Sequence, residues 1–156
     1  MLQTKKKIWY HNVMSEINTF MSAVTIDGET GVCAVNVYYN GRYIRMNDYK
    51  WTQDAIKRPL TEHSLILLSL LAFLSTYVLP GDNLVLYVSN PEVSFEWQKE
   101  YTESGRFAKS TKDQDLWKRI INFVKGKKIN LTIKGNESPL SSIAELSKRR
   151  ISRERG

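Results

Sequence analysis

Asp27 and Gly28 follow an apolar run that ends at Ile26, and Asp27 is the first residue of that region with a side chain suited to metal chemistry. A carboxylate at the end of a strand can bind Mg²⁺, because this ion prefers oxygen ligands. An aspartate before a glycine is equally typical of a turn, in which its side chain accepts hydrogen bonds from the backbone. The pair alone leaves both interpretations open.

Other residues that could carry out chemistry are few. Cys33 is the only cysteine, which excludes an internal disulfide, and its place in an alternating segment predicts a small buried side chain rather than a nucleophile. His11 and His63 have no cysteine or carboxylate partner at metal-ligand spacing, so we expect both to be surface residues without a role. No glycine-rich phosphate loop and no Ser/His/Asp arrangement is evident in the sequence.

The spacing of apolar residues predicts the elements that would position Asp27. Asn40-Gly41 predicts a tight hairpin turn, since both turn positions favour positive φ. A long buried helix is expected over Leu65–Leu79, with Thr61 as its N-cap, after an irregular polar segment that ends at Pro59. The remaining expected elements are strands at 20–26, 31–39, 42–47, 83–89 and 128–133, and helices at 92–101, 113–125 and from 139 onward.

Basic residues are concentrated in the last third of the chain. Residues 1–105 hold 9 Lys and Arg and 11 Asp and Glu, a net charge of −2, whereas residues 106–156 hold 14 and 5, a net charge of +9. Such a one-sided excess favours a polyanionic partner, most often nucleic acid, although a solvated basic tail is the simpler alternative. The residues expected to contact phosphates are Lys109, Lys112, Lys118, Arg119, Lys125, Lys127, Lys128, Lys148, Arg149, Arg150 and Arg153.

The order of the expected elements resembles the ribonuclease H-like fold of the retroviral integrase and ribonuclease H superfamily. The segments that carry the resemblance are Asp27-Gly28, the helix at 65–74, YVSNPEV at 87–93, TKDQDLW at 111–117 and residues 128–136. The resemblance implies a mixed α/β domain over residues 20–150, with a five-stranded mixed sheet in the order 3-2-1-4-5 and flanking helices. Residues 1–19 would form an N-terminal extension and residues 151–156 a basic tail.

In that family, two divalent cations are held by four carboxylates and cleave the RNA strand of an RNA–DNA hybrid. The resemblance places the first carboxylate at Asp27. The positions of the other three fall at or near Ile66, on Ser89 or Asn90, and near Ala144. Asp27 would then be a remnant of the catalytic set, and no cofactor is expected.

A relocated metal site is the alternative, and it would bind Mg²⁺. Glu62 lies one helical turn before Ile66, and Glu145 is adjacent to Ala144, so both are possible substitutes. Glu92 could approach from the segment after the fourth strand, but a charge at the start of a helix explains it equally well.

Three functions remain open from the sequence. The first is a catalytically impaired ribonuclease H-like protein that binds RNA–DNA hybrid, duplex or single-stranded nucleic acid, with Trp97, Tyr101 and Phe107 available to stack on bases. The second is a protein–protein interaction module in a replication, transposition or viral complex. The third is an active ribonuclease H with relocated carboxylates. The composition and the absence of a long apolar run predict a cytoplasmic location without membrane contact.

Overall fold

The computed structural model of the protein describes residues 15–135, in which a mixed sheet of six strands is covered by helices. The strands are β1 (Glu16–Thr25), β2 (Thr30–Tyr39), β3 (Arg42–Ile44), β4 (Tyr49–Thr52), β5 (Asn83–Val88) and β6 (Asn130–Lys134). The helices are α2 (Gln53–Ile56), α3 (Glu62–Tyr77), α4 (Pro91–Phe95), the π-helical segment η1 (Glu96–Glu103) and α5 (Gln114–Gly126). The last expected helix, from Pro139, lies outside the described residues.

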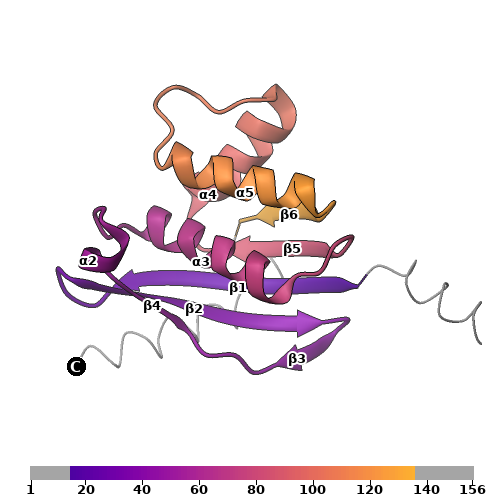
Figure 1. The fold of residues 1–156 in the computed structure, drawn as a ribbon, viewed down its shortest axis with the longest axis horizontal. Coiled ribbons are helices and arrows are strands. Elements are labelled where there is room, and N and C mark those ends of the chain that lie inside the picture. The colour runs from indigo at the N-terminus through magenta and orange to yellow at the C-terminus, as the bar shows by residue number, and fades with distance from the viewer. Residues whose placement is uncertain (1–14, 136–156) are drawn as a thin grey trace, which may run out of the picture.

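The order of strands across the sheet is β3-β2-β1-β5-β6, and β4 also pairs with β2 (Figure 1). β2 runs antiparallel to β1, β3 and β4, whereas β1, β5 and β6 run parallel to one another. The structure therefore confirms the mixed α/β class, with three antiparallel strands first in the chain and the next expected strand, β5, beside β1.

The region around β2 combines a confirmed turn with an unexpected strand. Asn40 and Gly41 both have positive φ, 49° and 83°, as the hairpin between β2 and β3 requires. β4 pairs with the first half of β2, although the sequence predicted an irregular segment there. The four residues of β4 alternate between half-buried and exposed, and this alternation is too short to distinguish a strand by itself. β1 begins at Glu16, inside the expected N-terminal extension.

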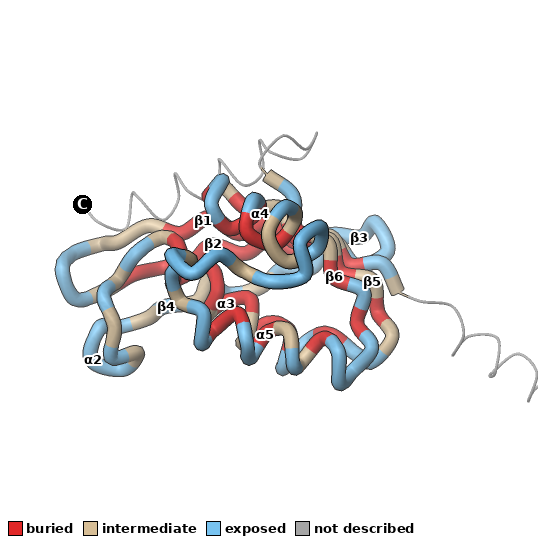
Figure 2. The backbone as a smooth tube through the Cα atoms, turned by 90° about the horizontal axis from the view of Figure 1, so that it is seen from above, coloured by how far each residue is buried: buried red, intermediate tan, exposed pale blue. Residues whose placement is uncertain are grey.

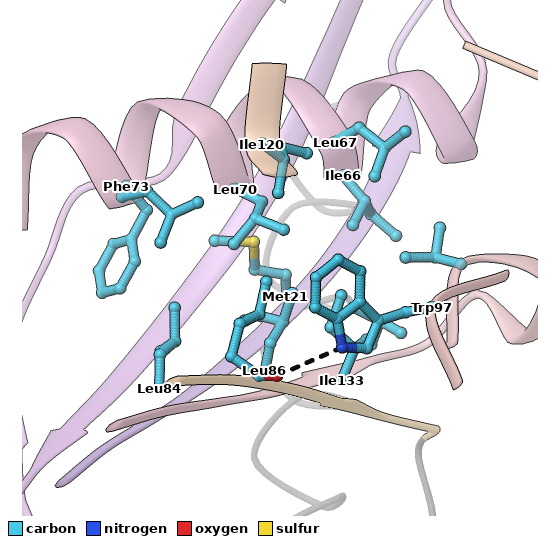
Figure 3. Packing of buried hydrophobic residues seen from close by; sticks show 14 of the residues in the cluster. Met21, Ile66, Leu67, Leu70, Phe73, Leu84, Leu86, Trp97, Ile120 and Ile133 are labelled. Atoms are coloured by element: carbon cyan, nitrogen blue, oxygen red, sulfur yellow. Dashed lines mark hydrogen bonds between the residues drawn. The ribbon is translucent and has the colours of Figure 1, made fainter. Parts of the chain in front are cut away.

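Helix α3 packs against β1 and β2 on one face of the sheet, and α5 lies beside it on the same face (Figures 1 and 2). The hydroxyl of Thr61 accepts a hydrogen bond from the Ser64 amide at 3.0 Å, which confirms Thr61 as the N-cap. Because the helix packs against both the sheet and α5, apolar residues occupy most of its circumference. Figure 3 shows side chains of α3 and α5 meeting those of β1, β5 and β6 in one core. Among the described residues, no helix is long and apolar enough to cross a membrane.

Candidate functional site

Asp27 lies in the turn between β1 and β2, and its side chain is exposed. Its Oδ1 atom accepts hydrogen bonds from the backbone amides of Glu29 at 2.8 Å and Thr30 at 2.7 Å. The amide of Ile26 completes the turn by donating to the Thr30 carbonyl at 2.8 Å. These are the contacts of a turn aspartate, one of the two interpretations that the sequence left open.

The register of β1 and β5 places Asp27 far from the carboxyl end of β5. Met21 pairs with Val88, and the amide of Ser89 donates to the Met21 carbonyl at 3.3 Å. Thr25, the last residue of β1, is four positions further along, which corresponds to about 13 Å at roughly 3.3 Å per residue. Asp27 follows two residues later. Carboxylates that share a pair of cations only about 4 Å apart must lie much closer together than this.

Two of the other positions implied by the resemblance have structural roles, and the third, near Ala144, lies outside the described residues. Ile66, a residue of α3, is fully buried in the core. The side chain of Asn90 caps α4 by accepting a hydrogen bond from the Val93 amide at 3.2 Å. Of the possible substitutes, Glu62 lies in the first turn of α3, Glu92 lies exposed in the first turn of α4, and Glu145 is outside the described residues.

These residues do not fit a magnesium site within the part of the chain that the structure describes. No group of three or more His, Cys, Asp or Glu side chains there has a metal-binding arrangement. Cys33 is buried as expected, and burial raises the pKa of its thiol to about 12, which leaves it protonated and unreactive at neutral pH.

The expected phosphate-binding residues of the described region lie along α5 and at its two ends. Lys118, Arg119 and Lys125 are exposed on the outer side of the helix, opposite its buried apolar residues. Exposed lysines also precede the helix and follow it: Lys109, Lys112, Lys127 and Lys128. We call all of these residues together the α5 basic face. The remaining expected residues, Lys148, Arg149, Arg150 and Arg153, lie outside the described residues.

Few acidic groups lie in the same segment of the chain as the α5 basic face. Residues 106–135 contain nine basic residues and only two acidic ones, Asp113 and Asp115, a net charge of +7. Both aspartates form salt bridges with Arg58, at 2.8 Å in the case of Asp113. Hydrogen bonding to Arg58 also holds the pKa of Asp115 below its usual value. Within residues 15–135, the cations of the α5 basic face form no salt bridge of their own.

No protein-family model and no curated protein matches the sequence, but solved structures match the fold. LC11-RNase H1 in complex with an RNA/DNA hybrid superposes with a TM-score of 0.57 at 11% identity, over 84% of this chain and 92% of that one. LC9-RNase H1, a type 1 RNase H with the type 2 active-site motif, gives a TM-score of 0.57 at 13% identity, over 88% and 71%. The protein has a ribonuclease H-like fold.

This ribonuclease H-like fold also matches part of a viral enzyme. The protease–reverse transcriptase of prototype foamy virus superposes with a TM-score of 0.54 at 15% identity, over 88% of this chain and 20% of that one. At such low identities the similarity establishes the fold alone, which agrees with the predicted fold class.

Within the ribonuclease H-like fold, His63 is buried, with 3% of its surface exposed, so the prediction of a surface histidine was wrong. Its Nδ1 atom lies 2.7 Å from Oδ2 of Asp113, and its Nε2 atom lies 2.6 Å from Oε1 of Glu96. Since both ring nitrogens contact carboxylates, both must donate, and the doubly protonated imidazolium is favoured. Burial lowers the pKa of His63, but the hydrogen bonds to Glu96 and Asp113 outweigh it and raise the pKa above its usual value.

The His63 contacts belong to a network that joins α3, η1 and α5. Glu96 also accepts a hydrogen bond from Nε1 of Trp117 at 2.9 Å, and Asp113 is shared between His63 and Arg58. Sequence reasoning missed this network because Glu96 and Asp113 lie 33 and 50 residues after His63. Contacts at such separations leave no periodic signal.

Of the three aromatic residues expected to stack on bases, Trp97 is accounted for by core packing, and Tyr101 and Phe107 are not. Trp97 and Trp117 are both buried, with 7% and 0% of their surface exposed. Tyr101 and Phe107 are half-buried and lie above these indoles, where each has part of its surface open to solvent.

Proposed function

We propose that this protein binds nucleic acid through the α5 basic face and has little or no ribonuclease H activity. The observation that carries the proposal is the alignment of unpaired cations on one side of a single helix and at both of its ends. A helix of 13 residues is about 20 Å long at 1.5 Å per residue, so α5 can follow several successive phosphates. Contacts of this kind are mostly independent of base sequence.

The fold similarity supports nucleic acid as the partner. LC11-RNase H1, with the same fold, is bound to an RNA/DNA hybrid in its crystal structure. By analogy we expect an RNA–DNA hybrid to be a ligand here as well, alongside duplex or single-stranded nucleic acid. Residues 15–135 supply the cations, whereas no carboxylate cluster with a metal-binding arrangement occurs among them.

Impaired catalysis is inferred from the carboxylates. Asp27 is held in a turn by two backbone hydrogen bonds, and the strand register separates it from Ser89. One carboxylate without others arranged around a metal position cannot hold two hydrated cations, since Mg²⁺ requires several oxygen ligands in octahedral geometry.

A binding and cleavage assay tests both parts of the proposal. RNA–DNA hybrid, duplex and single-stranded probes of equal length are incubated with the full chain in the presence of Mg²⁺ or Mn²⁺. We expect binding without efficient cleavage. Efficient cleavage of the hybrid that disappears in Asp27→Asn would instead establish an active ribonuclease H with relocated ligands, and Glu62→Gln would then be the next variant.

An interaction module is a second candidate, favoured by the outer edge of the sheet. Tyr43 and Ile44 of β3 have 48% and 39% of their surface exposed, and Tyr39 of β2 has 36%. Exposed large side chains on an edge strand are typical of protein contacts. Absence of binding to every nucleic-acid probe at low salt would favour this candidate.

A further inference from the structure

A pocket opens between the end of η1, the following loop and the outer side of α5. Its volume is about 470 Å³, within the range of about 300–1,000 Å³ that small-molecule sites occupy. Its lining includes the aromatic residues Tyr101 and Phe107 and the cations Arg106 and Lys118. Lys118 belongs to the α5 basic face, so the pocket continues the proposed binding surface. Gly105, which has a φ of 83°, contributes no side chain at its rim.

The floor of the pocket is an aromatic stack that rests on fixed indoles. The rings of Tyr101 and Phe107 are stacked, with centroids 5.5 Å apart and planes at 18°. Phe107 stacks in turn on Trp117 at 5.1 Å, and Tyr101 lies 5.0 Å from Trp97. The indole nitrogens of Trp117 and Trp97 donate to Glu96 and to the Leu131 carbonyl, so neither indole can turn freely. The two outer rings are therefore held in place before any ligand arrives.

The loop between η1 and α5 forms one wall of the pocket, and hydrogen bonds from both of these helices hold it in place. Oε1 of Glu100 accepts hydrogen bonds from the Ala108 amide at 2.7 Å and the Thr111 hydroxyl at 2.6 Å. From the opposite side, Nε2 of Gln114 donates to the carbonyls of Ala108, Lys109 and Thr111 at 3.1–3.2 Å. A wall fixed in this way lowers the entropic cost of binding, because little has to be ordered on arrival of the ligand.

We propose that this pocket takes an unpaired nucleobase of a single strand whose phosphates lie on the α5 basic face. The inference rests on the proposed nucleic-acid binding and names the substrate class: single strands, or single-stranded ends of a duplex or hybrid. The base would stack on the Phe107–Tyr101 floor, and Lys118 and Arg106 would contact the flanking phosphates. Such stacking accepts any base, because every base has a π face.

Cations at the rim together with an aromatic surface favour this occupant, because an acidic peptide side chain would use only the cations and an apolar one only the aromatic rings. Arg106 and Lys118 form no salt bridge within residues 15–135, and the one acidic lining residue, Asp115, is paired with Arg58. The cations therefore remain available for phosphates, while the aromatic floor supplies the surface that a planar ring requires.

The decisive experiment compares two single strands with the same number of phosphates: an oligothymidylate, and a strand of equal length in which the sugars carry no bases. Titration of the full chain with each strand gives the ratio of their binding constants. Stacking of one base predicts that the base-bearing strand binds about 5- to 150-fold more tightly. Phe107→Leu keeps an apolar side chain without a π face, and we expect it to lower the ratio clearly, although Tyr101 remains in the pocket.

Matched variants separate stacking from folding and from charge. Phe95→Leu replaces a phenylalanine that is 56% exposed on α4, outside the pocket lining, and is expected to leave the ratio unchanged. Lys118→Gln should weaken the binding of both strands equally, because it removes a phosphate contact. A strand with 2-aminopurine as its only base gives a readout without any variant, since its fluorescence is quenched when the base stacks on the wild-type protein.

Each outcome bears on a different part of the argument. A ratio near one for the wild type, an unchanged ratio in Phe107→Leu, or unquenched 2-aminopurine would overturn the base pocket while leaving duplex binding in place. Failure of all probes, duplex included, to bind at low salt would instead overturn the proposed function.

Discussion

At the scale of single residues, the turn role and the metal role of Asp27 make different predictions. Asp27→Ala removes an acceptor for two backbone amides and should lower the free energy of unfolding by about 1 kcal/mol. Asp27→Asn keeps an oxygen acceptor and should change the free energy of unfolding by less than about 0.5 kcal/mol. Urea unfolding with and without Mg²⁺ measures both effects. If Mg²⁺ stabilised the wild type but not Asp27→Asn, Asp27 would be a metal ligand after all.

The pKa of His63 gives a second prediction at this scale. In the folded protein the pKa is raised above its ordinary value of 6.5, so the native state binds more protons than the unfolded chain at higher pH. The stabilisation is then fully present below pH 6.5 and is lost as the pH rises through the folded-state pKa. Urea unfolding between pH 6 and pH 9 should show stability falling with pH. His63→Gln should reduce this dependence, and a wild type with no fall in this interval would contradict the assignment.

At the scale of elements, η1 is held to α3 and α5 by one buried carboxylate. Glu96→Gln removes one of the two carboxylates that contact His63 and should cost about 1.5–3 kcal/mol, the contribution of a hydrogen bond to a charged group, because Asp113 still contacts the imidazolium. Glu103→Gln is a matched control in the same segment, since its salt bridge with Lys99 is exposed and should contribute less than about 1 kcal/mol. Thermal or urea unfolding compares the two variants. Equal effects would mean that the buried network contributes no more than a surface pair.

The elements also show where sequence patterns are sufficient and where they fail. Asn40-Gly41 and the capped helix α3 could be predicted because their signals are local: a turn that needs positive φ, and an N-cap before an apolar run. β4 could not, because four residues carry too little alternation, and its pairing with β2 depends on the fold around it. The structural role of His63 depends in the same way on residues distant in sequence. The position of Asp27 relative to Ser89 depends on strand register, which a resemblance between short segments does not specify.

At the scale of the whole molecule, the distribution of charge separates into two parts that can be tested independently. Residues 106–135 carry a net charge of +7, and residues 136–156 add five basic and three acidic residues. Both parts contain residues that we expect to contact phosphates. Replacing three cations in either part changes the net charge equally, so a difference between the two variants reports contacts rather than general attraction.

The salt dependence of binding makes this comparison quantitative. The logarithm of the binding constant should fall with the logarithm of the salt concentration, with a slope of about −0.7 per neutralised phosphate for single strands and about −0.9 for duplex DNA. Replacing Lys118, Arg119 and Lys125 with alanine should flatten the slope by roughly one unit for each residue that contacts a phosphate. The free energy of unfolding should stay within about 0.5 kcal/mol, because all three residues are exposed and alanine favours helix. Replacing Lys148, Arg149 and Arg150 gives the matched variant. An unchanged slope in the first variant would remove α5 from the binding surface, and an unchanged slope in the second would confine that surface to α5.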